Sequence, residues 1–320
     1  MRAAVYYETG SPDVLKYEEV ADPQCFPGAV VIQVEAISIE GGDTLNRLGG
    51  DMPAVPHVVG YQCAGTITEV GDGVTDRHVG QRVVANSFYG SHAERFVTLS
   101  LLTWPIPESA DIVACACVPV AFGTASDCLF EFGKLQAGES VLIQAGAGGV
   151  GTAAIQLAKR AGATVLATAS SPERLERLRD LGMDHGIDYT RDGWVDEVKT
   201  KSGGWGVNVV VDSVGGKILQ GSIACLAPRG RAISVGSAGR DPQLLDISDL
   251  APGNRSLTGV FFGAEIGTDR AQKLVGDLVD DVATGRLRVV VDRTFPLSEA
   301  AAAHAYIEGR SAFGRVLLVP

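Results

Sequence analysis

Three glycines at a fixed spacing, Gly146, Gly148 and Gly151, stand in the stretch VLIQAGAGGVGTAA. They satisfy the pattern G-x-G-x-x-G between an apolar, strand-like run and a segment of helical composition. Glycines at these places allow a tight turn and a close backbone approach to a pyrophosphate, and the N-terminus of the following helix supplies N–H donors. The loop, which also contains Gly149 and Val150, therefore predicts a dinucleotide site. The alternative is a glycine-rich turn that serves only close packing.

The next strand-like run ends at ATASSPER, about 20 residues after the glycine loop, where an NAD site usually places Asp or Glu. This chain has Ser170 and Ser171 there, with Arg174 one turn into the next helix. Hydroxyl groups and a guanidinium suit a 2′-phosphate, and a charge-assisted hydrogen bond of about 1.5–3 kcal/mol corresponds to roughly 10- to 150-fold in affinity. We therefore expect NADPH rather than NADH. The alternative for Arg174 is a solvated side chain that pairs with a nearby Glu.

The glycine loop belongs to a run of alternating strand-like and helix-like segments. SVLIQA, TVLATAS, HGIDY, VNVVVDSV and RAISVG have the composition of strands, whereas GTAAIQLAKRA and SPERLERLRDLG have helical patterns. Ser171 suits the N-cap of the second helix and Pro172 its first position. Strands separated by helices predict an α/β fold with a doubly wound parallel sheet and helices on both faces.

The segments before the loop have a different pattern. Residues 1–100 contain short β-rich runs, AAVYY, VVIQVEAIS, GTITEV and RVVAN, separated by Gly, Pro and Asp. A stretch of helical length begins near Ala110, and the alternating region is followed by an amphipathic helix (DRAQKLVGDLVDDVATG) and a terminal strand (RVLLVP). We therefore expect a β-rich domain beside the α/β domain.

The composition is that of an ordinary globular chain. Of its residues, 46% are hydrophobic and 20% are charged. A length of 320 residues is sufficient for two hydrophobic cores. The formal net charge of −11 disfavours a polyanionic partner such as DNA. The six cysteines form no C-x-x-C pair, and no apolar run reaches the length of a signal-peptide core or a membrane span. We expect a soluble, cytoplasmic protein with no nucleic-acid or membrane partner.

The order of these features resembles a known family. A β-rich domain with GYQCAGTITEVGDGVTDRHVGQRVV precedes QAGAGGVG and VVVDSVGG, and the chain closes on GRVLLVP. Essentially the whole chain is similar to the medium-chain dehydrogenase/reductase superfamily, and the AGAGGVG loop resembles its zinc-free NADPH:quinone oxidoreductase (zeta-crystallin-like) branch. The resemblance implies a GroES-like β-rich catalytic domain, residues 1–118 and 264–320, and a Rossmann cofactor domain, residues 119–263.

The resemblance also bears on metal binding. Zinc-dependent relatives place a Cys where Glu40 stands, a His where Tyr61 stands and another Cys near Val120. A catalytic zinc site needs three protein ligands and an open position, and only Glu40 could ligate zinc here. No cluster of four closely spaced cysteines, as in the structural zinc lobe, occurs between residues 85 and 115. We expect no metal.

The stretch ISIEGGDTLNR departs from the quinone oxidoreductases, which usually carry Asn at the position of Glu40 and Tyr at that of Leu45. The resemblance implies that Glu40 faces the cleft between the domains near the nicotinamide. There it could orient a polar substrate, or act as an acid if burial raised its pKa. Alternatively, Glu40 pairs with a basic residue such as Arg47 or caps backbone N–H groups near Asp43. We expect Asp43 to be an N-cap for DTLNRL.

Further site residues follow from the resemblance. Tyr61 is a candidate hydrogen-bond donor to a developing oxyanion, with a packed aromatic as the alternative. Thr124 is expected at the nicotinamide end of the cofactor, or else as a helix N-terminal cap. We expect Leu45 and Phe88 in the substrate pocket and Asp212 to hold a turn. Other positions that line the cofactor in the family are Tyr189, Val235, Gly236, Ser237, Phe261, Phe262 and Gly263.

Without zinc no Lewis acid polarises an alcohol or ketone, so hydride transfer needs an acceptor that is already electrophilic. We expect an NADPH-dependent reductase of quinones or α,β-unsaturated carbonyl compounds. One alternative is an enoyl reductase that acts on a thioester or a biosynthetic intermediate. Another is a protein that holds NADPH without turnover. We also expect a homodimer that pairs edge strands near SLTGVFF.

Overall fold

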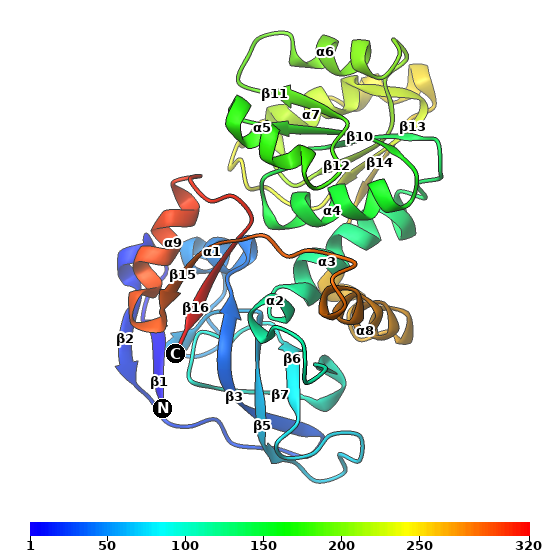
Figure 1. The fold of residues 1–320 in the computed structure, drawn as a ribbon. Helices are drawn as coiled ribbons and strands as arrows, with labels where there is room; N and C mark the ends of the chain where they lie inside the picture. Colours follow the sequence, from blue (N-terminus) through cyan, green and yellow to red (C-terminus); the bar gives the residue numbers. More distant parts are fainter. The chain divides into compact units, whose positions relative to one another are not determined.

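The structure is a computed structural model that describes residues 1–320. The chain divides into two compact units, which we call the first unit (Met1–Gly123 and Gly263–Pro320) and the second unit (Thr124–Phe262). Each unit has its own sheet and its own buried core (Figure 1). None of the helices combines the length and the apolar character needed to cross a bilayer.

The first unit is built on a seven-stranded sheet with the order β15-β16-β3-β5-β6-β8, and β7 pairs with β3. Its pairings are antiparallel except for β15 with β16. A smaller antiparallel sheet has the order β2-β1-β4. The strands are β1 (Arg2–Tyr6), β2 (Lys16–Glu19), β3 (Ala29–Ser38), β4 (His57–Val58), β5 (Gln62–Val70), β6 (Arg82–Asn86), β7 (Arg95–Leu99), β8 (Thr103–Pro105), β15 (Val291–Pro296) and β16 (Arg315–Val319).

The central strand β3 explains why this region folds as a sheet. Its sequence AVVIQVEAIS is rich in β-branched residues, and all but two of its residues are buried. Val30, Ile32 and Ile37 join Ile67 of β5 and Leu318 of β16 in one hydrophobic core. The strand ends at Ser38, where the chain turns into a helix and places residues 38–40 beside the terminal strand.

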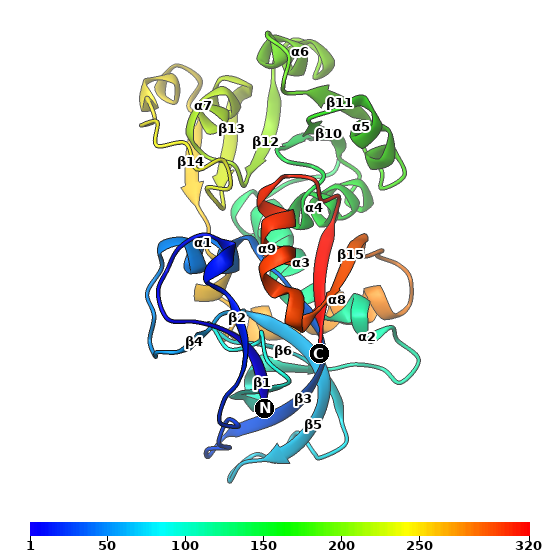
Figure 2. The same ribbon diagram turned by 90° about the vertical axis from the view of Figure 1, so that its left-hand side faces the viewer.

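The first unit also has four helices of its own. They are α1 (Gly41–Gly49), α2 (Ile112–Cys115), α8 (Asp269–Ala283) and α9 (Ala300–Glu308), and α3 (Val118–Ser126) continues into the second unit as a π-helical segment, Asp127–Phe132. Helix α9 packs against β15 and β16 (Figure 2). Helix α8 begins at the predicted place, after the N-cap Thr268, whose hydroxyl accepts from Ala271 N–H.

The second unit is a six-stranded, all-parallel sheet with the order β11-β10-β9-β12-β13-β14. Its strands are β9 (Ser140–Ile143), β10 (Thr164–Ala169), β11 (His185–Asp188), β12 (Val207–Asp212), β13 (Leu226–Ser234) and β14 (Ser256–Gly259). Its helices are α4 (Gly149–Arg160), α5 (Pro172–Arg179), α6 (Trp194–Lys201) and α7 (Gly216–Ala224). Right-handed crossovers put α4 and α5 on one face and α6 and α7 on the other. The predicted doubly wound fold is confirmed.

The strand order of the second unit reverses between β9 and β12, and ligands of such sheets bind at the carboxyl ends of the strands beside this point. The glycine loop lies there, between β9 and α4. Helix α5 begins as predicted, with Ser171 at the N-cap and Pro172 at the first helical position.

Candidate functional site

The glycine loop folds tightly on itself at the end of β9. Gly148 N–H donates to Ala145 O at 2.9 Å, and Gly146 N–H donates to Thr168 O at 2.8 Å. A Cβ added at Gly151 would lie 2.4 Å from Ala145 O, so only glycine fits this turn. Helix α4 starts at Gly149 and directs its first N–H groups out of the loop. The loop therefore fits a pyrophosphate, and its glycines also serve close packing.

A buried chain of hydrogen bonds lies beneath the loop. Ala145 N–H donates to Thr168 Oγ1 at 3.1 Å, and the Thr168 hydroxyl donates to Gln144 Oε1 at 2.7 Å. Gln144 Nε2 donates to Ser222 Oγ at 2.9 Å, and this hydroxyl donates to Asp212 Oδ2 at 2.8 Å. The chain connects the ends of β9, β10 and β12, so it fixes the loop to the sheet.

Asp212 holds the next turn of the sheet edge, as predicted. Its Oδ1 accepts from the N–H groups of Val214 and Gly215, each at 2.8 Å, and its carbonyl accepts from Val235 N–H at 2.8 Å. Burial raises the pKa of the Asp212 carboxyl, and these hydrogen bonds oppose that rise. Val235, Gly236 and Ser237 follow β13 directly and therefore lie at the same edge.

Of the residues expected around a 2′-phosphate, Ser170 and Ser171 directly follow β10, and Arg174 is the third residue of α5. Ser170 is exposed directly after β10, and Ser171 Oγ accepts from Arg174 N–H at 3.3 Å. The hydrogen bonds that Glu173 receives from its own backbone N–H and from the Ser171 hydroxyl lower the pKa of its carboxyl, so this hydroxyl both accepts and donates within the first turn of the helix. Tyr189 follows β11 and is half-buried, with its N–H bonded to Ala169 O at 3.3 Å.

The remaining expected cofactor positions differ in exposure. Thr124 is the seventh residue of α3 and is buried, so the alternative of a helix N-terminal cap is wrong. Phe261 is 64% exposed, whereas Phe262, at the end of the second unit, is buried. Gly263 follows it at the start of the second segment of the first unit.

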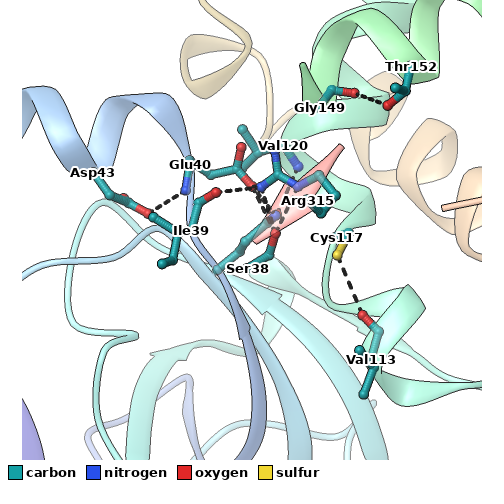
Figure 3. Close-up of polar contacts among 11 residues, drawn as sticks. Ser38, Ile39, Glu40, Asp43, Val113, Cys117, Val120, Gly149, Thr152 and Arg315 are labelled. Atoms are coloured by element: carbon teal, nitrogen blue, oxygen red, sulfur yellow. Dashed lines mark hydrogen bonds and ion pairs between the residues drawn. The ribbon is translucent and has the colours of Figure 1, made fainter. Parts of the chain in front are cut away.

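In the first unit, Glu40 is a buried residue at the N-cap position of α1. Its Oε1 accepts from the Arg315 guanidinium and from Ser38 Oγ at 3.3 Å (Figure 3). It also accepts from Gln62 Nε2 at 2.6 Å. The alternative that Glu40 pairs with a basic residue is confirmed, but the residue is Arg315. The guanidinium of Arg47 binds Glu308 and donates to Gly10 O at 2.6 Å.

Arg315 is itself fully engaged at this corner. It donates to Ser38 Oγ at 2.6 Å and to Ile39 O at 2.7 Å as well as to Glu40 (Figure 3). Burial raises the pKa of the Glu40 carboxyl, and the Arg315 guanidinium opposes this rise. Burial lowers the pKa of Arg315, but the Glu40 carboxylate outweighs that effect and raises it, so the arginine keeps its charge.

Contrary to the prediction, Asp43 is not the N-cap of this helix; the N-cap is Glu40, three residues earlier. Helix α1 begins at Gly41, so Asp43 is its third residue, and its Oδ2 accepts from Glu40 N–H at 2.7 Å. This is the return bond of a capping box. Because Glu40 precedes a pair of glycines that can enter the helix, the cap lies earlier than a sequence search for Asp, Asn, Ser or Thr indicates.

Gln62 bridges two of the three positions at which zinc-dependent relatives carry ligands. Its Nε2 donates to Glu40 Oε1 at 2.6 Å, and its Oε1 accepts from Val120 N–H at 2.9 Å. No group of three or more His, Cys, Asp or Glu residues is placed to hold a metal ion. Here the Gln62 amide and the Arg315 guanidinium connect the chain segments that carry the metal ligands in zinc-dependent relatives.

Tyr61, the third of these positions, is partly buried. Its hydroxyl accepts a hydrogen bond from Asn46 Nδ2 at 3.0 Å. Burial, with a smaller contribution from the negative charge of Asp43, raises the pKa of Tyr61 to about 12. The phenol is therefore protonated at neutral pH and can donate a hydrogen bond.

A pocket of about 240 Å³ lies on the first unit. Phe88, expected in the substrate pocket, lines it, whereas Leu45 is a half-buried residue of α1 outside the lining. Asn46, which holds the Tyr61 hydroxyl, also lines it. The other lining residues are Asp51, Pro53, His57 and Tyr89.

Comparison with known proteins supports one origin for the whole chain. The family model for the alcohol dehydrogenase GroES-like domain matches residues 26–100, and that for the zinc-binding dehydrogenase matches residues 149–280. The chain is 36% identical to 2-haloacrylate reductase of a Burkholderia species (99% of this chain, 98% of the relative). It is 31% identical to quinone oxidoreductase of Rattus norvegicus (100% and 98%). The crystal structure of Escherichia coli quinone oxidoreductase complexed with NADPH superposes with a TM-score of 0.95 at 27% identity over 100% of both chains.

The chain belongs to the medium-chain dehydrogenase/reductase superfamily. The resemblance to its quinone oxidoreductase branch is thereby confirmed, as is the combination of a GroES-like domain with a parallel-sheet Rossmann domain. One of the matching family models is named for zinc binding. The residues around Glu40, however, do not form a group of three or more His, Cys, Asp or Glu side chains that could hold a metal ion.

The contacts of three residues of this dehydrogenase/reductase were not predicted from the sequence, although the structure places these residues beside the predicted site residues. Arg315 reaches Glu40, Gln62 bridges Glu40 and Val120, and Asn46 holds Tyr61. One signal was available: Arg315 is a charged residue at the start of a buried, apolar terminal strand, where a charge needs a partner.

Proposed function

We propose that this protein is an NADPH-dependent oxidoreductase that transfers a hydride to a quinone or an α,β-unsaturated carbonyl compound. The glycine loop carries the proposal: it lies at the strand-order reversal, and the lack of Cβ atoms at Gly146 and Gly151 lets the backbone fold closely before α4. Two full-length relatives, named quinone oxidoreductase and 2-haloacrylate reductase, support the reaction class. The NADPH complex of the Escherichia coli enzyme supports the cofactor.

We assign the cofactor contacts to the second unit and to the segment that follows it. The loop from Gly146 to Gly151 and the first N–H groups of α4 bind the pyrophosphate, while Ser170, Ser171 and Arg174 bind the 2′-phosphate. NADPH, when bound, supplies the hydride. The residues that line the rest of the cofactor are Thr124, Tyr189, Val235, Gly236, Ser237, Phe261, Phe262 and Gly263. The contact-based units support the proposed division into residues 1–118 with 264–320 and residues 119–263.

Tyr61 is the proposed catalytic donor. Reduction of a conjugated carbonyl or a quinone places negative charge on an oxygen atom, and a neutral phenol can donate a hydrogen bond to it. The hydrogen bond that the Tyr61 oxygen accepts from Asn46 supports this role, because it leaves the phenolic proton to donate to another group. For Glu40 we propose a positioning role, since its Oε1 is bound by Arg315, Gln62 and Ser38.

Consumption of NADPH tests the proposal directly. Purified protein is mixed with NADPH and, one at a time, with para-benzoquinone, methyl vinyl ketone, acrylate and a crotonyl thioester, and the loss of nicotinamide absorbance is recorded. Rapid oxidation with the quinone or the ketone supports the proposal. Oxidation with the thioester alone favours an enoyl reductase, for which the departures at Glu40 and Leu45 are the supporting observation. Tight NADPH binding without oxidation by any acceptor indicates a binding protein.

We further propose a homodimer in the cytoplasm. Strand β14 is an edge of the six-stranded sheet, and Phe261, just beyond its end, is exposed, so a second copy could pair there. All six cysteines are free, and five of them are buried, in keeping with a reducing compartment. Light scattering on a sizing column that gives the monomer mass would contradict the dimer, and cell fractionation tests the location.

A further inference from the structure

We infer that one face of helix α1, formed by Gly42 and Asn46, holds the Tyr61 side chain so that its hydroxyl donates a hydrogen bond. We call this face the seat of Tyr61, and Asn46 and Gly42 are positioning residues for the reaction. The inference rests on the proposed function, in which Tyr61 donates to the oxygen of the acceptor. It adds two residues of α1 that neither the sequence pattern nor the family comparison indicates.

The hydrogen bond from Asn46 determines which way the Tyr61 proton points. Asn46 Nδ2 can only donate, so the Tyr61 oxygen must accept in this bond of 3.0 Å. The phenolic proton is therefore directed away from Asn46 and is left to donate to another group. Asn46 also lines the pocket of the first unit, whereas Tyr61 is not part of that lining.

Gly42 supplies the room for the Tyr61 ring. A Cβ at this position would lie 2.4 Å from Tyr61 Cε2 and 2.6 Å from Tyr61 Oη, closer than real contacts allow. Gly42 and Asn46 are four residues apart on α1, so they lie on one face of the helix, and both contact the phenol. A side chain at position 42 would therefore move the hydroxyl itself.

Asp43, which lies between these two residues in sequence, connects the start of the same helix to the backbone of Tyr61. Its carboxylate is fully buried and accepts from Glu40 N–H, and the backbone N–H of Tyr61 also faces it. Burial raises the pKa of Asp43 well above its usual value, and both N–H groups oppose this rise. The backbone of Tyr61 and its hydroxyl are thus both held by α1, through separate residues.

A double-mutant cycle tests the inference. The variants are Tyr61→Phe, Asn46→Ala, the combination of the two, Asn46→Asp and Gly42→Ala, with Leu48→Ala, an exposed residue of the same helix, as the matched control. Each is assayed for kcat with the best acceptor of the panel, for the KM of NADPH and for the midpoint of thermal unfolding. Removal of one oxyanion donor lowers kcat about 10²- to 10³-fold, and this is the loss expected for Tyr61→Phe.

The inference predicts that Asn46→Ala lowers kcat at least about tenfold while the KM of NADPH stays unchanged, and that the double variant is no slower than Tyr61→Phe alone. Asn46→Asp should be slower than Asn46→Ala, because a carboxylate accepts the Tyr61 proton and withdraws it from the acceptor. Gly42→Ala should lower kcat as well, and Leu48→Ala should leave it unchanged.

The outcomes separate this inference from the proposed function. If Tyr61→Phe is slow but Asn46→Ala has wild-type kcat, or if the two losses multiply in the double variant, the seat is overturned and the role of Tyr61 stands. If Tyr61→Phe itself retains wild-type kcat, the seat and the donor role of Tyr61 are both overturned, whereas the proposed NADPH-dependent reduction stands. Should Asn46→Ala lose its cooperative unfolding transition, Asn46→Asp, which is nearly the same size, carries the test: a kcat equal to wild type overturns the inference.

Discussion

Arg315 and Glu40, which are 275 residues apart in sequence, form a buried ion pair where the terminal strand meets the start of α1. The arginine also donates to Ser38 and to Ile39 O, so one guanidinium connects β16 to the β3–α1 corner. Charges taken out of water are costly unless they are paired and hydrogen-bonded, and here the pairing is nearly complete. The corner that carries Glu40 and the seat of Tyr61 therefore depends on the last six residues of the chain.

Replacement of Arg315 by methionine should destabilise the protein strongly. The change leaves the Glu40 carboxylate buried without its cation, and the loss of one partner of such a pair costs about 3–5 kcal/mol. Chemical denaturation measures the free energy of unfolding. Lys273→Ala, which breaks the exposed pair with Asp277 on α8, is the matched control and should cost less than about 0.5 kcal/mol. Equal effects of the two variants would show that Arg315 contributes no more than a surface charge.

Stability should fall below neutral pH because of His92 and His304. Their Nε2 atoms are 3.1 Å apart in the core of the first unit, and both rings are fully buried. Burial lowers the pKa of His92 to about 3, and burial together with the charges of His92 and Arg47 lowers that of His304 well below its usual value. The unfolded chain therefore binds more protons, so stability is complete above pH ~6.5 and is lost as the pH falls toward the folded-state pKa values.

The size of this effect follows from the pKa difference. At pH 5, protonation of the unfolded chain at His92 costs about 2 kcal/mol of stability, and His304 adds to it in the same direction. Denaturation curves between pH 7 and pH 5 measure the slope. The double variant His92→Gln with His304→Gln should have a flatter profile, and a wild-type slope that persists in this variant would assign the acid sensitivity to other groups.

Thr168→Val should weaken NADPH binding. It removes the hydroxyl that accepts from Ala145 N–H and donates to Gln144, so two buried groups beneath the glycine loop lose their partners. An unsatisfied buried group costs about 1–3 kcal/mol, so a rise of roughly 5- to 150-fold in the Kd of NADPH is expected if the loop relaxes. Fluorescence titration with NADPH measures it. Thr200→Val, on the exposed face of α6, controls for the loss of a hydroxyl and should bind NADPH normally.

Arg174→Ala should change the choice between the two nicotinamide cofactors. Loss of a charge-assisted hydrogen bond to the 2′-phosphate should lower the ratio of kcat/KM for NADPH to that for NADH by roughly 10- to 150-fold. Arg179→Ala, in the last turn of the same helix and paired with Glu176, serves as the control. An unchanged ratio in the Arg174 variant would remove this residue from the 2′-phosphate site.

The sequence predicted best what is local. The period and composition of SVLIQA, GTAAIQLAKRA and TVLATAS determined the strands and helix around the glycine loop, and the cap at Ser171 follows from its neighbours alone. The ion pair of Glu40 could not be found in this way, because Arg315 and Arg47 are equally suitable by residue type and only the strand pairing of β16 with β3 selects one. The hydrogen bond from Asn46 to Tyr61 likewise depends on how a helix packs against a distant strand.

The central claim is that bound NADPH gives its hydride to an electrophilic acceptor. A single-turnover measurement tests it: the protein is loaded with NADPH deuterated at the transferred position, mixed with the best acceptor of the panel, and the nicotinamide absorbance is followed. We predict that the absorbance decays, and that it decays more slowly than with ordinary NADPH because a bond to deuterium breaks. No decay with any acceptor, or the same rate with both forms of the cofactor, would contradict the account.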